Sequence, residues 1–439
     1  MSLFRLLANA GLSLFFDRIE VEGEERVPRD GPLLVVANHT NGLVDGLLLA
    51  VVTPRAVSLT AKSALRRNPL MAFVIWMSDT VPLYRRQDDA GEVAKNADSF
   101  VEIRRRLTRG GAIAIFPEGV SHSDAALREF RTGAARIAFD FAEQGGRGLR
   151  IVPAGLHYEA KQRFRSPVWV RFGEAIDFDA WRAADAARTP RELTGELEER
   201  IRALTANFGR VREALWLRWT ADLVASQAAD PPPLDAAPRR YADRARLLQE
   251  LQVDYARADR GAVAALFRDL RTYRRDLRRM GIAPEEVWLS MHPARAAFFM
   301  LRELELLVAG SLLFALGIVQ HGAPLVIDRA LTKKLSKDLD HWASNAIFYG
   351  FAIFPLFWLT GIVLVATLAS PRWALAYAAL LPFTLIYTIL FSQRAAGAFR
   401  RARTFLLFLF RHGLQRELQV RGVALLQSIE QLRAMSNEQ

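Results

Sequence analysis

Residues 33–45 read LLVVANHTNGLVD, an apolar run that passes directly into a polar stretch. The run at 33–37 is short and rich in aliphatic side chains, which is typical of a buried strand. Asn41 and Gly42 form a turn signal shortly after it. The stretch therefore predicts a strand that ends in a bend, with polar side chains gathered at the carboxyl end of the strand.

Three further apolar runs lie in the first half of the chain and alternate with helical stretches. They are 80–84 (TVPLY), 112–116 (AIAIF) and 149–156 (LRIVPAGL). The alternation predicts an α/β fold, in which we expect a mixed sheet covered by helices. Ligands bind outside the carboxyl ends of the strands in open α/β sheets, so the residues that follow the runs are the candidates for chemistry.

His39 and Asp45 are the first candidates. An imidazole beside a carboxylate is the arrangement for general-base catalysis, because the acid fixes the imidazole tautomer and stabilises the imidazolium that forms. The two residues are six positions apart, whereas side chains that meet on a straight helix are three or four apart, so the chain must bend between them. The plainer interpretation of such a pair by itself is a solvated loop.

Polar residues also follow two of the other runs. The run 112–116 continues into 117–124 (PEGVSHSD), where an ordinary strand-to-helix turn explains the glycine and the serines but not Glu118. Arg85 follows the run 80–84, and a planar guanidinium at a strand end suits phosphate through bidentate contact. A surface salt bridge would look the same in the sequence.

Together these segments resemble the glycerolipid acyltransferase family, the glycerol-3-phosphate and lysophosphatidate acyltransferases, over about residues 17–180. Five short segments carry the resemblance in the order in which the family has them. They are a lead-in at 23–28 (GEERVP), a first block from Asn38 and His39 to Asp45, a second at 81–85 (VPLYR), a third at 116–119 (FPEG) and a fourth at 152–156 (VPAGL).

The chain departs from the common family pattern at two points. Five residues separate His39 from Asp45 where four are usual, and 120–122 (VSH) stands where the family has Thr-Arg-Ser. Both variations occur in a subgroup that resembles the fungal glycerol-3-phosphate and dihydroxyacetone-phosphate acyltransferases, which also have the Arg-x-Gln-Asp found here at 85–88. The residue that replaces the third-block arginine is left open, with His122 and Ser121 as candidates.

The resemblance implies transfer of a fatty acyl chain from acyl-CoA or acyl-carrier protein to glycerol-3-phosphate or a lysophosphatidate, as in phospholipid synthesis. His39 would be the general base and Asp45 its partner. No cofactor is implied besides the thioester co-substrate. The residues implied to bind substrate are Asn38, Lys62, Arg85, Glu118, Gly119, Ser121 and His122.

Two other functions remain open beside this one. The first is the same chemistry on another lysolipid, since the shape of a pocket cannot be read from one sequence. The second is a non-catalytic lipid-binding membrane scaffold, against which the intact His39, Asp45 and Glu118 argue. The seven histidines are scattered, and none forms a metal site of two histidines and a carboxylate at ligand spacing.

The charge indicates an anionic partner. The formal net charge is +12, and a strongly basic chain attracts nucleic acid, acidic lipid or phosphorylated substrates. Arginine-rich segments flank uncharged apolar runs here, and neither zinc-finger spacing nor an RNA-binding aromatic motif is present in the sequence, so we expect membrane lipids and no nucleic acid. The chain has no cysteine, which excludes disulfides, thiolate metal sites and a cysteine nucleophile.

Hydropathy predicts a membrane region at the C-terminal end. Two uncharged runs are each near the roughly 20 residues that cross a bilayer as a helix. A shorter run before them meets Gln320 and Pro324, which favours a re-entrant or interfacial element. The expected regions are an interfacial or domain-packed helix at 1–16, the acyltransferase domain at 17–205, a charged helical region at 206–295, and a membrane region at 296–439 with a re-entrant segment at 306–327, transmembrane helices at 345–369 and 373–391, and a basic C-terminal helix.

The expected location is a bacterial inner membrane, because the Ala- and Arg-rich composition is associated with GC-rich bacterial genomes. Lysine and arginine flank both ends of the predicted hairpin, whereas its connecting turn offers only Arg372. The positive-inside rule therefore puts both flanks, and with them the catalytic domain, on the cytoplasmic side.

Overall fold

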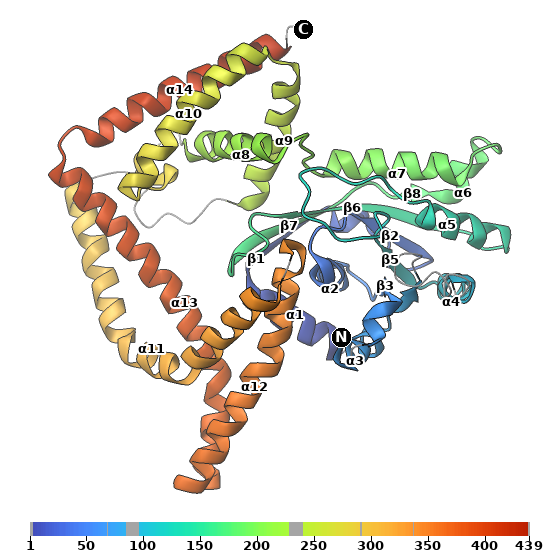
Figure 1. The fold of residues 1–439 in the computed structure, drawn as a ribbon, viewed down its shortest axis with the longest axis horizontal. Coiled ribbons are helices and arrows are strands. Elements are labelled where there is room, and N and C mark those ends of the chain that lie inside the picture. Colours follow the sequence, from blue (N-terminus) through green and yellow to red (C-terminus); the bar gives the residue numbers. More distant parts are fainter. Residues whose placement is uncertain are drawn as a thin grey trace. The chain divides into compact units, whose positions relative to one another are not determined.

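The computed structural model describes residues 3–67, 69–84, 96–227, 240–289, 292–336 and 338–437 (Figure 1). The chain forms two compact units. The first comprises residues 1–207 together with 331–349, and the second comprises 208–330 together with 350–439. The first unit holds the sheet, and every site residue discussed below belongs to it.

An eight-stranded mixed sheet is the centre of the first unit, in the order β1-β7-β6-β2-β5-β3-β4, with β8 paired to β6. Most neighbouring strands are parallel, but β7 and β8 run antiparallel to β6, which confirms the predicted mixed sheet. The strands are β1 (Phe16–Glu22), β2 (Leu33–Ala37), β3 (Ser58–Lys62), β4 (Val81–Leu83), β5 (Ala112–Ile115), β6 (Arg150–Tyr158), β7 (Ser166–Phe172) and β8 (Ile176–Asp177).

Strand β2 lies between β5 and β6, parallel to both. Each of its five side chains is fully buried, because successive residues of a strand face opposite sides of the sheet and both sides are covered. Leu33, Val35 and Ala37 pack in one hydrophobic core, and Leu34 and Val36 pack in the other. This arrangement fixes the position of the polar residues that follow Ala37.

Helices cover both faces of the sheet (Figure 1). Helices α1 and α2 contribute to the first core, and α4, α5 and α7 contribute to the second. The elements of the unit besides the strands are α1 (Leu3–Phe15), η1 (Glu24–Arg26), α2 (Gly42–Val52), η2 (Ser63–Arg67), α3 (Pro69–Met77), α4 (Asn96–Thr108), α5 (Gly133–Glu143), α6 (Phe178–Ala183), α7 (Pro190–Leu204) and η5 (Leu339–His341).

The compact unit is larger than the domain expected at 17–205. Helix α1 belongs to it, because Ala8 and Leu12 are buried in the first core; Leu3 and Leu6, in contrast, are exposed. Residues 331–349 also belong to it, and their Ala343 is buried in the same core. A segment more than a hundred residues beyond the domain thus completes it, which no local pattern in the sequence indicates.

The second unit is helical throughout its described residues. Its α10 has buried residues at helical spacing from Val263 to Leu277 among charged ones, as expected of a solvated layer with one buried stripe. The elements are α8 (Val211–Ser226), α9 (Tyr241–Arg257), α10 (Arg260–Met280), η4 (Pro284–Trp288), α11 (Pro293–Leu335), α12 (Trp342–Leu368), α13 (Pro371–Phe410) and α14 (Leu414–Asn437), of which α11 and α12 extend into the first unit.

Within the described residues, three helices are long and apolar enough to cross a membrane, namely α11, α12 and α13. The predicted span 345–369 lies within α12 except for its last residue, and the predicted span 373–391 lies within α13. The basic residues after 391 continue α13 to Phe410. The predicted segment 306–327 lies inside α11, which is helical through Gln320 and Pro324. The segment stays helical across its proline, because an apolar helix tolerates an internal proline when its neighbours satisfy the freed backbone groups.

Candidate active site

His39 lies at the carboxyl end of β2, one residue after Asn38, and faces Asp45 in the first turn of α2. Its Nδ1 is 3.0 Å from Oδ2 of Asp45. Asn41 and Gly42 supply the bend that the spacing required, and Gly42 has a φ of +49°, in the left-handed region that favours glycine. The predicted pair is thus brought together.

Asp45 is fully buried and accepts hydrogen bonds on both oxygens. Oδ2 accepts from the backbone amides of Thr40 and Asn41, each at 2.7 Å, as well as facing His39. Oδ1 accepts from the phenol of Tyr158 at 2.5 Å. A carboxylate bonded by this many donors is held in one orientation.

These contacts assign the proton on His39. Because Oδ2 of Asp45 can only accept, Nδ1 of His39 is the protonated nitrogen and Nε2 carries the free lone pair. The ring is stacked on Phe116 with a centroid distance of 4.3 Å, which fixes its plane. The His39 side chain is 19% exposed, so a base is presented to solvent from a rigid, mostly buried setting.

Tyr158 was not among the predicted residues. It is the last residue of β6 and lies in the first core. Burial, together with the neighbouring Asp45 carboxylate, raises the pKa of Tyr158 well above its ordinary value of 10.0. The phenol therefore remains a hydrogen-bond donor to Asp45 at neutral pH.

The buried side chain of Glu118 links the loop that follows β2 to the loop that follows β5. Its Oε1 accepts from the backbone amide of His39 at 2.7 Å, and its Oε2 accepts from the backbone amide of Arg128 at 3.1 Å. Oε2 also bonds Nε2 of His122, whose Nδ1 accepts from the backbone amide of Asp124. The side chains of Glu118 and His122 are at most 2% exposed, so they support the site from inside the protein.

Asn38 also bonds backbone groups of the protein. Its amide donates to the backbone carbonyl of Leu156 at 3.1 Å and accepts from the Leu156 amide at 2.7 Å. The side chain is buried and continues the pairing of β2 with β6 beyond the end of β2. Asn38, Glu118 and His122 were predicted to bind substrate, but the geometry favours a structural role for all three.

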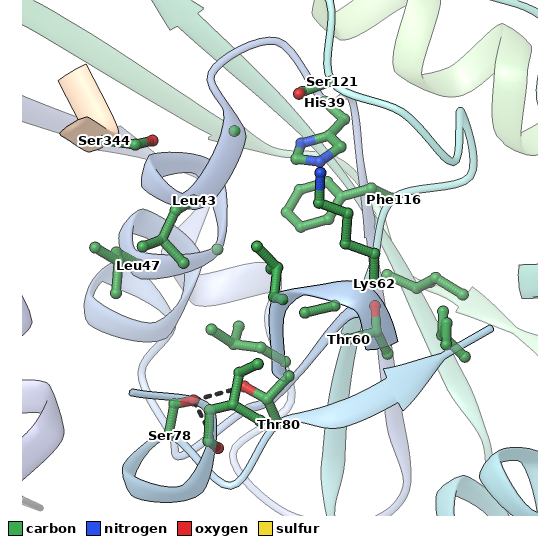
Figure 2. Close-up of a pocket in the computed structure, with 18 of the residues that line it drawn as sticks. His39, Leu43, Leu47, Thr60, Lys62, Ser78, Thr80, Phe116, Ser121 and Ser344 are labelled. Carbon is green, nitrogen blue, oxygen red and sulfur yellow. Dashed lines mark hydrogen bonds between the residues drawn. The ribbon is translucent and has the colours of Figure 1, made fainter. Parts of the chain in front are cut away.

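A cavity of about 720 Å³ opens beside His39. Figure 2 shows His39 at one end, Leu43 and Leu47 of α2 along a wall, and Ser78 and Thr80 at the far end. The hydroxyls of Ser78 and Thr80 are 2.6 Å apart and bond each other. The lining between the two ends is mainly aliphatic and aromatic, which suits a hydrocarbon chain.

Two cations line the cavity, Lys62 and Arg131. Figure 2 shows the Lys62 amine pointing toward the His39 ring. A Cβ at Gly119 would lie 3.1 Å from Cδ and Nε of Arg131, so the glycine leaves room for the arginine side chain. Among the described residues neither cation has a carboxylate partner within ion-pair distance.

The segment before α12 forms another part of the cavity wall. Ser121 donates to Oδ2 of Asp340 at 2.5 Å, and Ser344 accepts from the backbone amide of Val44 at 3.3 Å. A Cβ at Gly42 would lie 2.8 Å from the backbone oxygen of Asp340. Gly42 thus serves a close approach as well as a bend. No pattern in the sequence links these residues, which are more than two hundred positions apart.

The predicted substrate residues separate into three groups. Lys62, Gly119 and Ser121 line the cavity beside His39, whereas Asn38, Glu118 and His122 lie behind it. Arg85 lies outside the described residues. Within the described ranges there is no cluster of three or more His, Cys, Asp or Glu side chains that could hold a metal ion.

Comparison with known proteins finds a matching family model and several similar proteins. Residues 18–157 match the family model described as Acyltransferase. An uncharacterized acyltransferase of Schizosaccharomyces pombe is 24% identical over 250 residues, which are 38% of this chain and 37% of that protein. Glycerol-3-phosphate O-acyltransferase 2 of Saccharomyces cerevisiae is 32% identical over 111 residues, 25% of this chain and 15% of that protein.

A bacterial relative matches over a larger share of its length. Lyso-ornithine lipid O-acyltransferase of Rhizobium meliloti is 27% identical over 229 residues, which are 45% of this chain and 73% of that protein. The matched part spans well under half the length of both yeast proteins. The residues that match the family model, 18–157, lie in the unit that holds the sheet.

Proposed function

We propose that this chain transfers a fatty acyl group from an acyl thioester to the hydroxyl of a phosphorylated glycerol. The match of residues 18–157 to the Acyltransferase family model and the similarity to a glycerol-3-phosphate O-acyltransferase support this proposal. Acyl-CoA and acyl-carrier protein are the candidate donors, and glycerol-3-phosphate and lysophosphatidate are the candidate acceptors. The observation that carries the proposal is the pairing of His39 with buried Asp45 at the end of an apolar cavity.

The chemistry needs one base and no covalent enzyme intermediate. The acceptor hydroxyl donates its proton to Nε2 of His39 while its oxygen attacks the thioester carbonyl. The carbon–sulfur bond then breaks, and the imidazolium returns the proton to the departing thiolate. Asp45 keeps the imidazole in the required tautomer and stabilises its charged form. The backbone bonds to Asp45 support this role, because they hold the carboxylate before substrate arrives.

Lys62 and Arg131 are the proposed contacts of the acceptor phosphate, with Arg85 as the third. Arg131 would take the place of the arginine that the family has in its third block, a role for which the sequence offered His122 or Ser121. Its guanidinium crosses Gly119 at the cavity wall, and a guanidinium binds phosphate through a planar fork. His122 is less suited, because Glu118 and the Asp124 amide use both its ring nitrogens.

The apolar part of the cavity would hold the acyl chain. Its walls include Leu43 and Leu47 of α2 and Val74 and Ile75 of α3. Holding a hydroxyl and a carbonyl in a near-attack geometry lowers the barrier by several kcal/mol, because the entropy is already lost on binding. Three long apolar helices support a membrane location for the protein, and we propose a bacterial inner membrane with the catalytic unit on its cytoplasmic side.

Acylation of another lysolipid is the second candidate function, favoured by the relative from Rhizobium meliloti. The test is an acceptor panel with the purified full-length protein. Glycerol-3-phosphate, dihydroxyacetone phosphate, 1-acylglycerol-3-phosphate and a lyso-ornithine lipid are each offered with acyl-CoA and with acyl-carrier protein. Turnover of a phosphorylated acceptor supports the proposal, and turnover of the ornithine lipid alone supports the second candidate. Failure with all four would favour a non-catalytic scaffold.

A further inference from the structure

The hydroxyl proton of Ser121 is committed to a residue outside the family region. Ser121 donates to Oδ2 of Asp340 at 2.5 Å, over a separation of 219 residues. A carboxylate accepts hydrogen bonds and donates none, and a serine hydroxyl has one proton and two lone pairs. While this bond exists, Ser121 can only accept a hydrogen bond from a substrate.

Ser121 is placed to meet the acceptor beside the reacting hydroxyl. It lines the same cavity as His39, and Figure 2 shows the two residues next to each other at one end of it. The backbone amide of the next residue, His122, donates to the carbonyl of His39 at 3.2 Å, which fixes the spacing of the two loops. We therefore expect the group on the carbon next to the reacting hydroxyl to lie at Ser121.

Asp340 is held in place by its own neighbours. It is 5% exposed, and its backbone oxygen lies against Gly42 so closely that a Cβ there would be 2.8 Å away. Ser344, one helical turn further on, bonds the amide of Val44 and the carbonyl of Asn41. The carboxylate is thus fixed against the loop that carries His39, and the direction of the Ser121 proton is set before substrate binds.

We propose that Ser121, oriented by Asp340, selects an acceptor that has a second hydrogen-bond donor beside the reacting hydroxyl. This inference rests on the proposed function and narrows its acceptor. Glycerol-3-phosphate carries such a donor, a hydroxyl on the neighbouring carbon. Dihydroxyacetone phosphate has a carbonyl there and 1-acylglycerol-3-phosphate has an ester, and both groups only accept, so they would face a lone pair of Ser121 without a proton between them.

The test is a comparison of kcat/KM for the three acceptors in the full-length protein. Wild type should prefer glycerol-3-phosphate to dihydroxyacetone phosphate. Ser121→Ala should reduce that preference about 3- to 10-fold, the size of one neutral hydrogen bond, mainly through glycerol-3-phosphate. Asp340→Ala should raise the use of dihydroxyacetone phosphate, because Ser121 is then free to donate to its carbonyl.

The matched control is Asp140→Ala, which removes a carboxylate on α5 that bonds Arg104 and does not line the cavity. It should leave the preference unchanged, and thermal unfolding should confirm that all three variants are folded. Equal use of the two acceptors by wild type, or an unchanged preference in folded Ser121→Ala or Asp340→Ala, would overturn the selection. If the protein used 1-acylglycerol-3-phosphate alone, the selection by Ser121 would be wrong and the acyltransferase function would stand. If it used none of the three acceptors, both the selection and the acyltransferase function would be wrong.

Discussion

The phenol of Tyr158 lies directly behind Asp45, on the side away from His39. Its hydroxyl donates to Oδ1 of Asp45 at 2.5 Å, while Oδ2 of the same carboxylate faces Nδ1 of His39 at 3.0 Å. The side chains of Tyr158 and Asp45 are buried. Tyr158 is therefore a positioning residue, which acts on the base only through the carboxylate between them.

Replacement of this tyrosine should slow the chemical step without weakening substrate binding. In Tyr158→Phe the ring still fills the core, but Asp45 loses a donor, and a hydrogen bond to a charged group contributes about 1.5–3 kcal/mol. We expect kcat to fall about tenfold, with the KM of the acceptor unchanged. Steady-state kinetics will check this, and a variant with normal kcat or a raised KM would contradict the positioning role.

The same tyrosine makes a prediction for alkaline pH. Burial and the Asp45 carboxylate raise the pKa of Tyr158 in the folded protein above its ordinary value of 10.0. A group whose pKa is raised on folding stabilises the fold fully below its unfolded pKa and loses that contribution as pH rises toward the folded value. Wild type should therefore lose stability above pH 10 more steeply than Tyr158→Phe. Chemical denaturation of both proteins across this range measures the difference.

Two neighbouring histidines should respond to mutation in opposite ways. His39→Ala removes a partly exposed base and should lower turnover roughly 10²- to 10⁴-fold with little change in Tm. His122→Ala removes a buried partner of Glu118 and should cost about 1–3 kcal/mol of stability, because Oε2 of that buried carboxylate loses one of its two donors. Activity assays and thermal unfolding of both variants separate the roles. A folded His39→Ala protein with normal turnover would exclude the mechanism.

The parts of the fold that follow local rules could be predicted from the sequence. The runs at 33–37, 112–116 and 149–156 coincide with β2, β5 and β6, because strands buried on both faces are continuously apolar. Strand β3 (Ser58–Lys62) was missed, since SLTAK has no apolar run. The bend between His39 and Asp45 followed from their spacing alone.

The site residues that the sequence analysis missed have roles that depend on tertiary contacts. Tyr158 reads as one more apolar residue of β6, and only its partner Asp45 distinguishes it. Asp340 comes from a segment far outside the acyltransferase region. Arg131 has no sequence signal beyond its charge. Only the position of its side chain across Gly119 makes it a candidate phosphate contact. Glu118 and His122 were predicted as substrate contacts because they are polar loop residues, and only the structure shows that they bond each other.

The two cations of the cavity should affect acceptor binding. Arg131 is exposed and makes no ion pair among the described residues, so Arg131→Ala should leave Tm unchanged and raise the KM of the phosphorylated acceptor. Lysine should restore it in part, since a point charge replaces a fork. Arg85→Ala, predicted from the sequence to bind the same phosphate, should act in the same direction. Equal losses for acceptor and thioester would remove either residue from this role.

The last prediction concerns how α11 meets the membrane. Within the second unit, three hydrogen bonds join α11 to α13, and their partners run from Arg394 back to Thr384. They are Glu303 with Arg394 at 2.8 Å, the carbonyl of Gly310 with Tyr387 at 3.0 Å, and His321 with Thr384 at 2.9 Å. The ring of His321 also contacts Trp358 of α12. In the first unit, Ser336 bonds Asn345 at the beginning of α12. These contacts do not reach the turn at Ser370 that joins α12 to α13. They favour an α11 that bends within the membrane, as its internal Pro324 permits, and that begins and ends on the same side.

A second argument gives the same result. Residues 338–344 contact the loop of His39 through Asp340 and Ser344, so Lys334 must lie on the same side of the membrane as the catalytic unit. The described residues between the sheet and α11 include no candidate span, and 228–239 (AADPPPLDAAPR) is too polar and proline-rich to be one. A single crossing by α11 would therefore separate segments that touch.

Single cysteines can test this, because the chain has none. We expect Lys334→Cys and Ser436→Cys to react with an impermeant reagent from the side that labels a reference cysteine at the exposed Glu143 of α5, and Arg372→Cys to react only from the other side. The positive-inside rule predicts that the shared side is cytoplasmic, since the basic residues that flank the hairpin lie there: Arg329, Lys333, Lys334, Arg394 and Arg400. Labelling of position 334 from the side opposite position 143 would establish a third crossing. It would also contradict the contact between Asp340 and Ser121, because those residues could not then share one side of the membrane.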